Sequence, residues 1–89
     1  MIIEFKDLYI DDAVIFRVAF QAVANGVSVS CQITYEALQD IDPPNGSKSP
    51  SDLYLQNKEV IHDVAKRLII SGRVHNAQLL ITTDDMKTQ

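Results

Sequence analysis

The amino-acid sequence predicts an α+β fold: a small, mainly antiparallel β-sheet of three or four strands, with one short and one long helix packed on one face. Three observations lead to this prediction. Two runs of alternating residues flank Asn25-Gly26, a helical pattern extends from Ser49 to about Ile70, and a strand-like run follows at Gln78–Thr83. With 89 residues, the chain 1–89 is expected to form a single domain.

Residues 14–35 predict a β-hairpin. Asn-Gly is the strongest short-range signal of a type I′ turn, because both central residues need positive φ, which Asn tolerates and Gly adopts freely. With this turn Ala24 faces Val27 and Phe16 faces Tyr35, and a slip of one residue would set apolar side chains opposite serines. The predicted apolar face comprises Phe16, Val18, Phe20, Ala22, Val29, Cys31, Ile33 and Tyr35.

The segments on either side of the hairpin are shorter. Ile2–Phe5 predicts a short strand, followed by a loop over residues 7–12 in which Tyr9 and Ile10 pack against the hairpin edge. After the hairpin, Thr34 is a suitable N-cap for a short helix that begins at Tyr35. The prolines at 43 and 44 end this helix, and residues 42–49 are predicted to form a mobile loop.

The long helix has clear boundary signals. Ser49 is a suitable N-cap, Pro50 suits the first helical position, and Gly72 is a good residue for the C′ position. At about 100° per residue, one apolar stripe faces the sheet. This stripe comprises Leu53, Tyr54, Val60, Ile61, Val64, Ala65 and Leu68.

Two residues depart from this helical pattern. Asn57 falls in the apolar stripe, so it marks either a kink or restart of the helix, or a buried polar group that needs partners. Ile70 projects from the polar face. If other apolar surface joins Leu55 and Ile70, these two residues form a self-association contact.

The C-terminal part predicts a link over residues 73–77, a last strand over 78–83 and a frayed tail over 84–89. The single cysteine and the lack of an apolar run of about 20 residues predict a cytoplasmic protein that does not enter the membrane. The net charge of −4 argues against a polyanionic partner.

Cys31 with His62 or His75 is the combination of nucleophile and base that the sequence offers. Cysteine catalysis needs a thiolate in a partly exposed, electropositive setting. The predicted register instead places Cys31 in the middle of a strand on the apolar face, where a cysteine packs as a small hydrophobic residue. We therefore expect no catalytic residue and no enzymatic activity.

Metal and acid–base sites are also weakly indicated. Glu59 and His62 have the spacing of one half of a carboxylate-bridged metal site, but zinc needs three or four ligands, and His62, His75 and Cys31 do not have the spacing of a zinc site. His62 is expected to be solvated on the flank of the helix. The acid pairs Asp11-Asp12 and Asp84-Asp85 are expected to be solvated too, since no apolar pocket is evident to raise a carboxyl pKa. We expect no metal, no cofactor and no small-molecule substrate.

Four basic residues gather near the end of the long helix. Lys66, Arg67, Arg73 and His75 complement the helix dipole, or they contact an anion, a partner or nucleic acid. The dipole interpretation is favoured, because no aromatic side chains are interleaved with these bases.

Several segments resemble one protein family. The hairpin residues Ala13–Phe16, Asn25-Gly26 and Val29–Ile33, then Glu36–Leu38, Asn57–Ala65, Gly72 and the strand Leu80–Thr82, are similar to the bacterial domain of unknown function 1488 family. The resemblance covers most of residues 13–83 and implies a bacterial, cytoplasmic, single-domain α+β protein. It implies no activity and no site.

These observations favour a non-enzymatic module that binds another protein or forms a homodimer. The alternative is an accessory or regulatory protein that contacts nucleic acid through Lys66, Arg67 and Arg73. An enzyme is the third hypothesis, and it would require a cleft that contains Cys31 or His62.

Overall fold

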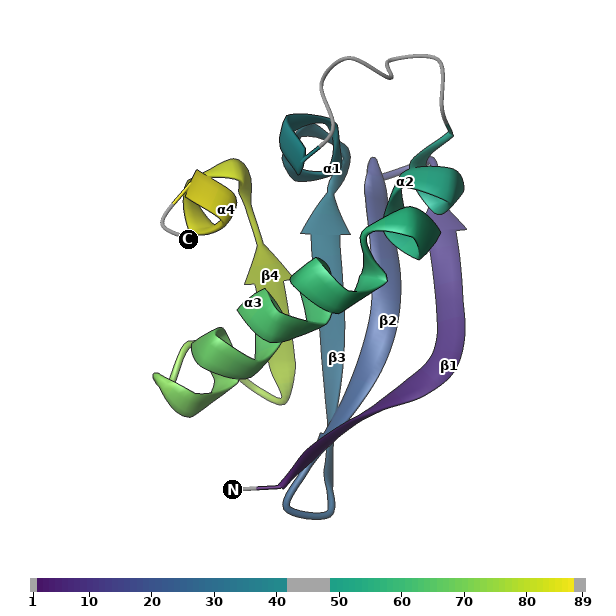
Figure 1. The fold of residues 1–89 in the computed structure, drawn as a ribbon. Helices are drawn as coiled ribbons and strands as arrows, with labels where there is room; N and C mark the ends of the chain where they lie inside the picture. Colours follow the sequence, from purple (N-terminus) through teal and green to yellow (C-terminus); the bar gives the residue numbers. More distant parts are fainter. Residues whose placement is uncertain (1, 42–48, 88–89) are drawn as a thin grey trace.

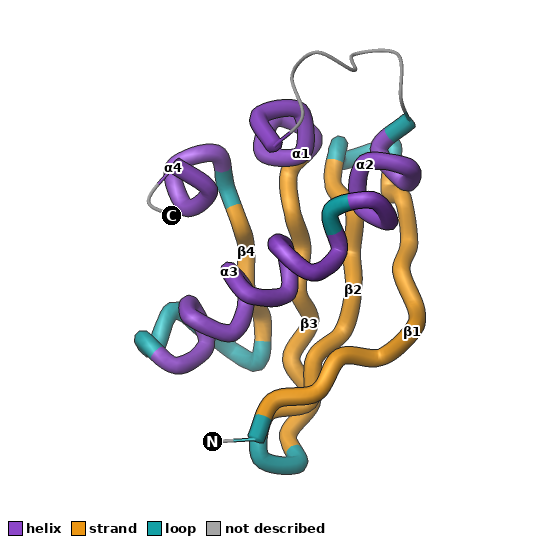
Figure 2. The backbone as a smooth tube through the Cα atoms, in the orientation of Figure 1, coloured by secondary structure: helices purple, strands orange, loops and turns teal. Residues whose placement is uncertain are grey.

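The computed structural model describes residues 2–41 and 49–87. Within them a four-stranded sheet has the order β1-β2-β3-β4, and helices α2 and α3 cross one face of it (Figures 1 and 2). The first three strands are antiparallel and β4 is parallel to β3, so the predicted α+β fold is confirmed. The elements are β1 (Ile3–Asp12), β2 (Arg17–Ala24), β3 (Val27–Thr34), α1 (Tyr35–Ile41), α2 (Pro50–Gln56), α3 (Lys58–Ile70), β4 (Gln78–Ile81) and α4 (Thr83–Lys87).

The hairpin forms in the predicted register. Ala24 pairs with Val27 and Phe20 with Cys31, around a turn in which Asn25 and Gly26 have φ of 49° and 83°. The ladder ends at the pair Arg17–Thr34, however, one residue before the predicted pair of Phe16 with Tyr35. Phe16 instead closes the turn after β1, so its predicted place on the covered apolar face was wrong.

The N-terminal strand is longer than predicted. β1 continues through the expected loop to Asp12 and pairs with the whole length of β2. Its register shifts between Phe5 and Tyr9, where three residues of β1 lie opposite Gln21. This irregularity bends the strand and interrupts the alternation on which the sequence-based prediction depended.

The helix boundaries follow the predicted signals. The Thr34 hydroxyl accepts a hydrogen bond from the Ala37 N–H at 3.1 Å, and the Ser49 hydroxyl accepts one from the Asp52 N–H at 3.2 Å. Gly72 adopts φ of 84° and ends α3, with Arg73 N–H donating to the Leu68 carbonyl at 3.0 Å. Of the predicted loop 42–49, residues 42–48 lie outside the described part of the chain.

Asn57 interrupts the predicted long helix, so of the two alternatives for this residue the helix restart is the one observed. It separates α2 from α3, and its Nδ2 donates to the Leu53 carbonyl at 2.9 Å rather than capping α3. The buried residues of α3 are Ile61, Val64, Ala65 and Ile69, of which all but Ile69 belong to the predicted stripe. Val60, predicted to be buried, is exposed, and Ile69 takes a place in the core.

The core lies between the sheet and the helices. It comprises Val18, Phe20, Ala22, Val29, Cys31, Ile33, Ala37, Leu38, Leu53, Tyr54, Ile61, Val64, Ala65, Ile69, Leu79 and Ile81. No helix within residues 2–41 and 49–87 is long and apolar enough to cross a membrane.

The predicted frayed tail is helical up to Lys87, because Asp85 ties it to the rest of the fold. Asp85 is 8% exposed, its carboxylate accepts the Thr82 N–H at 2.9 Å, and its other oxygen pairs with Arg73 at 3.0 Å. The prediction that both members of Asp84-Asp85 are solvated was therefore wrong for Asp85. The remaining tail residues, 88–89, are not among those described.

Candidate interaction surface

One edge of the sheet is long and open in the described part of the chain. β1 pairs with β2 along one edge, while its residues from Lys6 to Asp11 are all exposed. The opposite edge of the sheet, β4, has only 4 residues against the 10 of β1. An unpaired strand edge presents free backbone N–H and C=O groups, to which another strand can pair.

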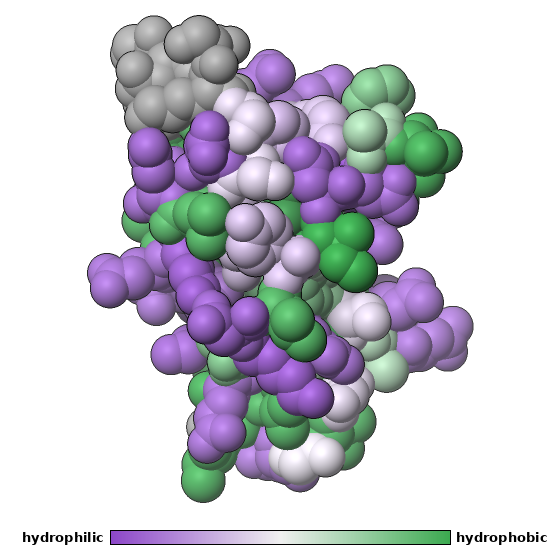
Figure 3. Space-filling view, turned by 90° about the vertical axis from the view of Figure 1, so that its right-hand side faces the viewer, coloured by the Kyte–Doolittle hydropathy of each residue, from purple (hydrophilic) through white to green (hydrophobic). Residues whose placement is uncertain are grey.

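Large apolar side chains are exposed along the second half of β1 and the turn that follows it. We call this set the β1 apolar segment. Figure 3 faces the β1 side of the molecule and shows hydrophobic side chains interspersed with hydrophilic ones. The segment comprises Leu8 (68% exposed), Ile10 (68%), Val14 (87%), Ile15 (43%) and Phe16 (65%).

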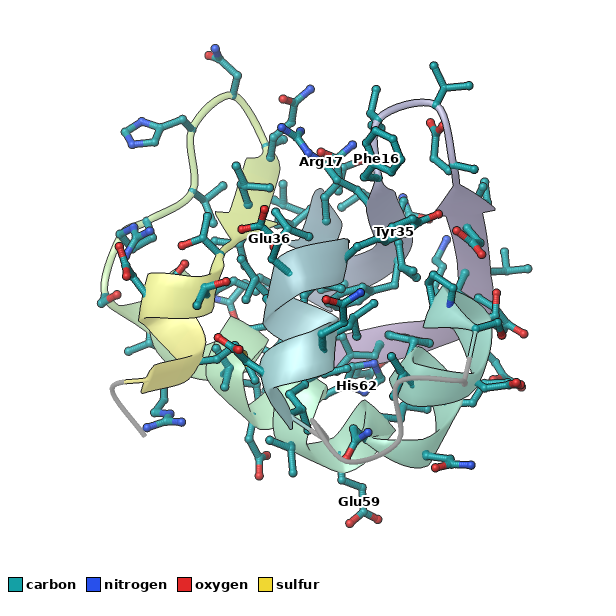
Figure 4. All side chains as sticks on the ribbon, turned by 90° about the horizontal axis from the view of Figure 1, so that it is seen from above. Phe16, Arg17, Tyr35, Glu36, Glu59 and His62 are labelled. Atoms are coloured by element: carbon teal, nitrogen blue, oxygen red, sulfur yellow. The ribbon has the colours of Figure 1, made fainter. Side chains whose placement is uncertain are left out.

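Phe16 occupies an unfavourable backbone conformation. Its φ of 57° lies in the left-handed region, which glycine and asparagine adopt more readily than a bulky residue. The Phe16 carbonyl accepts the Tyr35 N–H at 3.0 Å, and the two rings meet edge to face at 5.7 Å (Figure 4). At the start of the same turn, the Val14 N–H donates to the Asp12 carboxylate at 3.1 Å.

The inner side of β1 is held by aromatic stacking. Phe5 stacks on His62 of α3 at a ring distance of 3.9 Å, and Tyr9 contacts Tyr54 of α2 at 5.3 Å. His62 Nε2 lies 2.9 Å from the Tyr54 hydroxyl. These contacts hold β1 against the core, while its outer edge stays exposed.

Polar contacts add to this anchoring. Lys58 forms a salt bridge with Asp7 at 3.0 Å. The Asp11 carboxylate accepts hydrogen bonds from the hydroxyl groups of Tyr35 and Ser51. The hydrogen bond to Asp11 raises the pKa of Tyr35 to about 12. The side chains of Asp7 and Asp11 are thus engaged on the helix side of the sheet.

His62 is not solvated, contrary to the sequence-based expectation. It is half-buried among aromatic rings, and burial, together with Lys58 and Lys66, lowers its pKa to about 4. Figure 4 shows Glu59 pointing away from the molecule and His62 pointing into it. Among the described residues, no group of three or more His, Cys, Asp or Glu side chains is arranged to hold a metal ion.

Cys31 is fully buried in the core, as its strand register predicts. Burial raises the pKa of its thiol to about 12, against a smaller opposing effect of the hydrogen bond with the Ala22 backbone. The thiol contacts the Val29 carbonyl at 3.8 Å. Cys31 is therefore protonated at neutral pH and is a poor nucleophile.

The predicted basic cluster divides between two surfaces. Lys66 and Arg67 line a shallow depression on α3 together with Asp63. Arg73 and His75 line another depression, which also contains Arg17 and Gln32 of the sheet. Because Arg73 is paired with Asp85, its charge is largely compensated within the fold.

The predicted self-association residues Leu55 and Ile70 are 46% and 63% exposed. Leu55 shares a depression with Val60 at the junction of α2 and α3, whereas Ile70 is the last residue of α3. The β1 apolar segment was missed at the sequence level. Its signal was the unbroken apolar run Val14-Ile15-Phe16, which does not fit the alternation of a half-buried strand.

Comparison with known proteins identifies the family. No curated protein matches the chain. A crystal structure of a protein of unknown function from the DUF1488 family of Shewanella loihica has the same fold, with a TM-score of 0.72 at 19% sequence identity over 89% of this chain and 90% of that one. Residues 3–81 match the family described as "Protein of unknown function (DUF1488)", and the chain belongs to this family.

Proposed function

We propose that this protein is a non-enzymatic, cytoplasmic protein-interaction module, and that it binds through the open edge of β1 and the β1 apolar segment. The observation that carries the proposal is the position of five large apolar side chains, all more than 40% exposed, beside an unpaired strand edge. Single exposed apolar residues are ordinary, whereas exposed apolar groups mark interaction sites, and here Val14, Ile15 and Phe16 are three consecutive exposed residues. Strand edges add main-chain hydrogen bonds to such contacts.

Phe16 supports the proposal independently. An aromatic side chain at positive φ weakens the fold, and 65% of this residue is exposed, so burial returns little of the loss. Aromatic residues are enriched among the residues that dominate binding energies. A contact between the Phe16 ring and a partner would compensate this loss.

The experiment is site-specific photo-crosslinking in the cells that produce the protein. A photoreactive residue replaces Ile10 or Phe16 in the β1 apolar segment, and in separate variants it replaces Ile70 or Gln39. Covalent adducts at positions 10 and 16, but not at Gln39 on the exposed side of α1, are the expected result. Adducts at 70 alone would move the interaction surface to the helix face, and absence of adducts at 10 and 16 would refute the proposal.

The nucleic-acid alternative has narrower support. Arg17 and His75 line one depression together with Arg73, whose charge Asp85 largely compensates, so the local basic surface on this acidic protein rests mainly on Arg17. Fluorescence anisotropy with labelled single- and double-stranded oligonucleotides tests it. Binding that weakens as salt increases, and that Arg17→Gln reduces, would favour this function over the first.

A further inference from the structure

We propose that the partner of the β1 edge is β1 of a second copy of this chain, paired antiparallel about a two-fold axis at Tyr9. The inference rests on the proposed function and names its partner. A two-fold axis perpendicular to the sheet joins the two sheets into one of eight strands, and it closes the assembly at two copies. A residue that lies a given number of positions before Tyr9 in one copy then faces the residue that lies the same number of positions after Tyr9 in the other.

The side chains of β1 complement themselves in this register. Ile10 and Asp12 pair with Ala19 and Arg17 on the sheet side that carries none of the described helices. Across the register shift, Phe5 and Tyr9 pair with core residues and Asp7 contacts Lys58 of α3, so Lys6 and Leu8 between them lie on the side away from the helices. On that side Leu8 faces Ile10 of the second copy, and Lys6 faces its Asp12, each pair occurring twice.

Neighbouring registers lack this complementarity. An axis at Leu8 sets Lys6 opposite Ile10 and Glu4 opposite Asp12, whereas an axis at Ile10 sets Leu8 opposite Asp12. Both place a charge against an apolar side chain. Lysine on an edge strand usually prevents pairing. In the register about Tyr9, Lys6 faces a carboxylate, that of Asp12.

α2 lies over the Asp12 end of β1, where Ser51 contacts Asp11 (Figure 1). In an antiparallel pair, the α2 helices of the two copies therefore lie at opposite ends of the joined strands. On the helix side Asp7 faces Asp11 of the second copy, and each carboxylate already has a partner in its own chain.

Charge exchange tests the ionic pairs. The wild-type protein is expected to dimerise in sedimentation velocity, and Lys6→Asp or Asp12→Lys alone to weaken dimerisation about tenfold or more, since each creates two like-charged pairs. An equimolar mixture of the two variants restores both pairs and is expected to form a heterodimer. Circular dichroism of each variant controls for folding, and a mixture that stays as weakly associated as its components would refute the register.

Cysteine cross-linking tests the axis itself. In the proposed register, position 8 of one copy faces position 10 of the other, at a distance suited to a disulfide. Mild oxidation should therefore cross-link a mixture of Leu8→Cys and Ile10→Cys but neither variant alone. The wild type, with its buried Cys31, is the background control.

The outcomes separate this inference from the proposed function. Cross-linking of Leu8→Cys alone or Ile10→Cys alone would move the axis and overturn the register. A chain that is monomeric at all concentrations and gives no cross-link overturns the dimer. If photo-crosslinking at Ile10 still yields adducts with another protein, the interaction module stands and only the identity of its partner is wrong.

Discussion

Phe16 combines an unfavourable backbone conformation with an exposed ring, which we propose contacts a partner. Asparagine tolerates its φ of 57° better, so Phe16→Asn is expected to leave the free energy of unfolding unchanged or to raise it by about 0.5 kcal/mol. The same change should abolish the adduct formed by a photoreactive residue at position 10. Urea unfolding measures the first effect. A loss of stability well above 1 kcal/mol would mean that the ring contact with Tyr35 is structurally important.

His62 links stability to pH at the residue scale. Its pKa is about 4 in the folded protein and 6.5 in the unfolded chain, so unfolding takes up a proton between these values. Its contribution to stability is present above pH 6.5 and is lost as the pH falls towards 4. After allowance for partial exposure, this loss is about 1–2 kcal/mol.

The variant His62→Phe isolates this contribution, because it keeps a ring to stack on Phe5 but does not titrate. Between pH 7.5 and pH 4, the urea midpoint of the wild type is expected to fall further than that of the variant, because only the wild type loses the His62 contribution. Carboxyl groups titrate equally in both proteins and cancel in the difference. Parallel pH profiles would contradict the lowered pKa of His62.

At the scale of elements, α4 depends on a contact that is distant in sequence. Burial raises the pKa of Asp85, but the Thr82 N–H and Arg73 outweigh it and hold the pKa below its usual value. Asp85→Asn is expected to destabilise the protein by about 2–3 kcal/mol, because Arg73 loses its carboxylate. Asp84→Asn, at the exposed neighbouring position, is the matched control and should change stability by less than about 0.5 kcal/mol. Equal urea midpoints for the two variants would show that Asp85 does not hold α4.

The elements that the sequence predicted well are those with local signals. Asn25-Gly26 set the hairpin register, and Thr34, Ser49 and Gly72 set helix ends, because turns and caps are determined by residues a few positions apart. Three features lacked such signals. The bend in β1 broke its alternation, α3 contributes Ile69 rather than Val60 to the core, and Asp85 of α4 is paired with Arg73, 12 residues earlier in the chain. The candidate surface was missed for the same reason, since Val14–Phe16 were assigned to the strand that follows them.

At the scale of the whole molecule, dimerisation would supplement a small core. A domain of this size buries a limited share of its surface, so its stability as a monomer is modest. If folding is coupled to pairing through β1, the melting temperature must rise with protein concentration. With an unfolding enthalpy of about 0.7 kcal/mol per residue, the expected rise is roughly 4 °C for each tenfold increase in concentration. Differential scanning calorimetry over two decades of concentration measures it.

Lys6→Asp, whose dimer is weakened, provides the comparison, and its melting temperature should stay constant over the concentrations at which it is monomeric. A wild-type melting temperature that is equally constant would place the dissociation constant above the range studied and remove dimerisation as a source of stability.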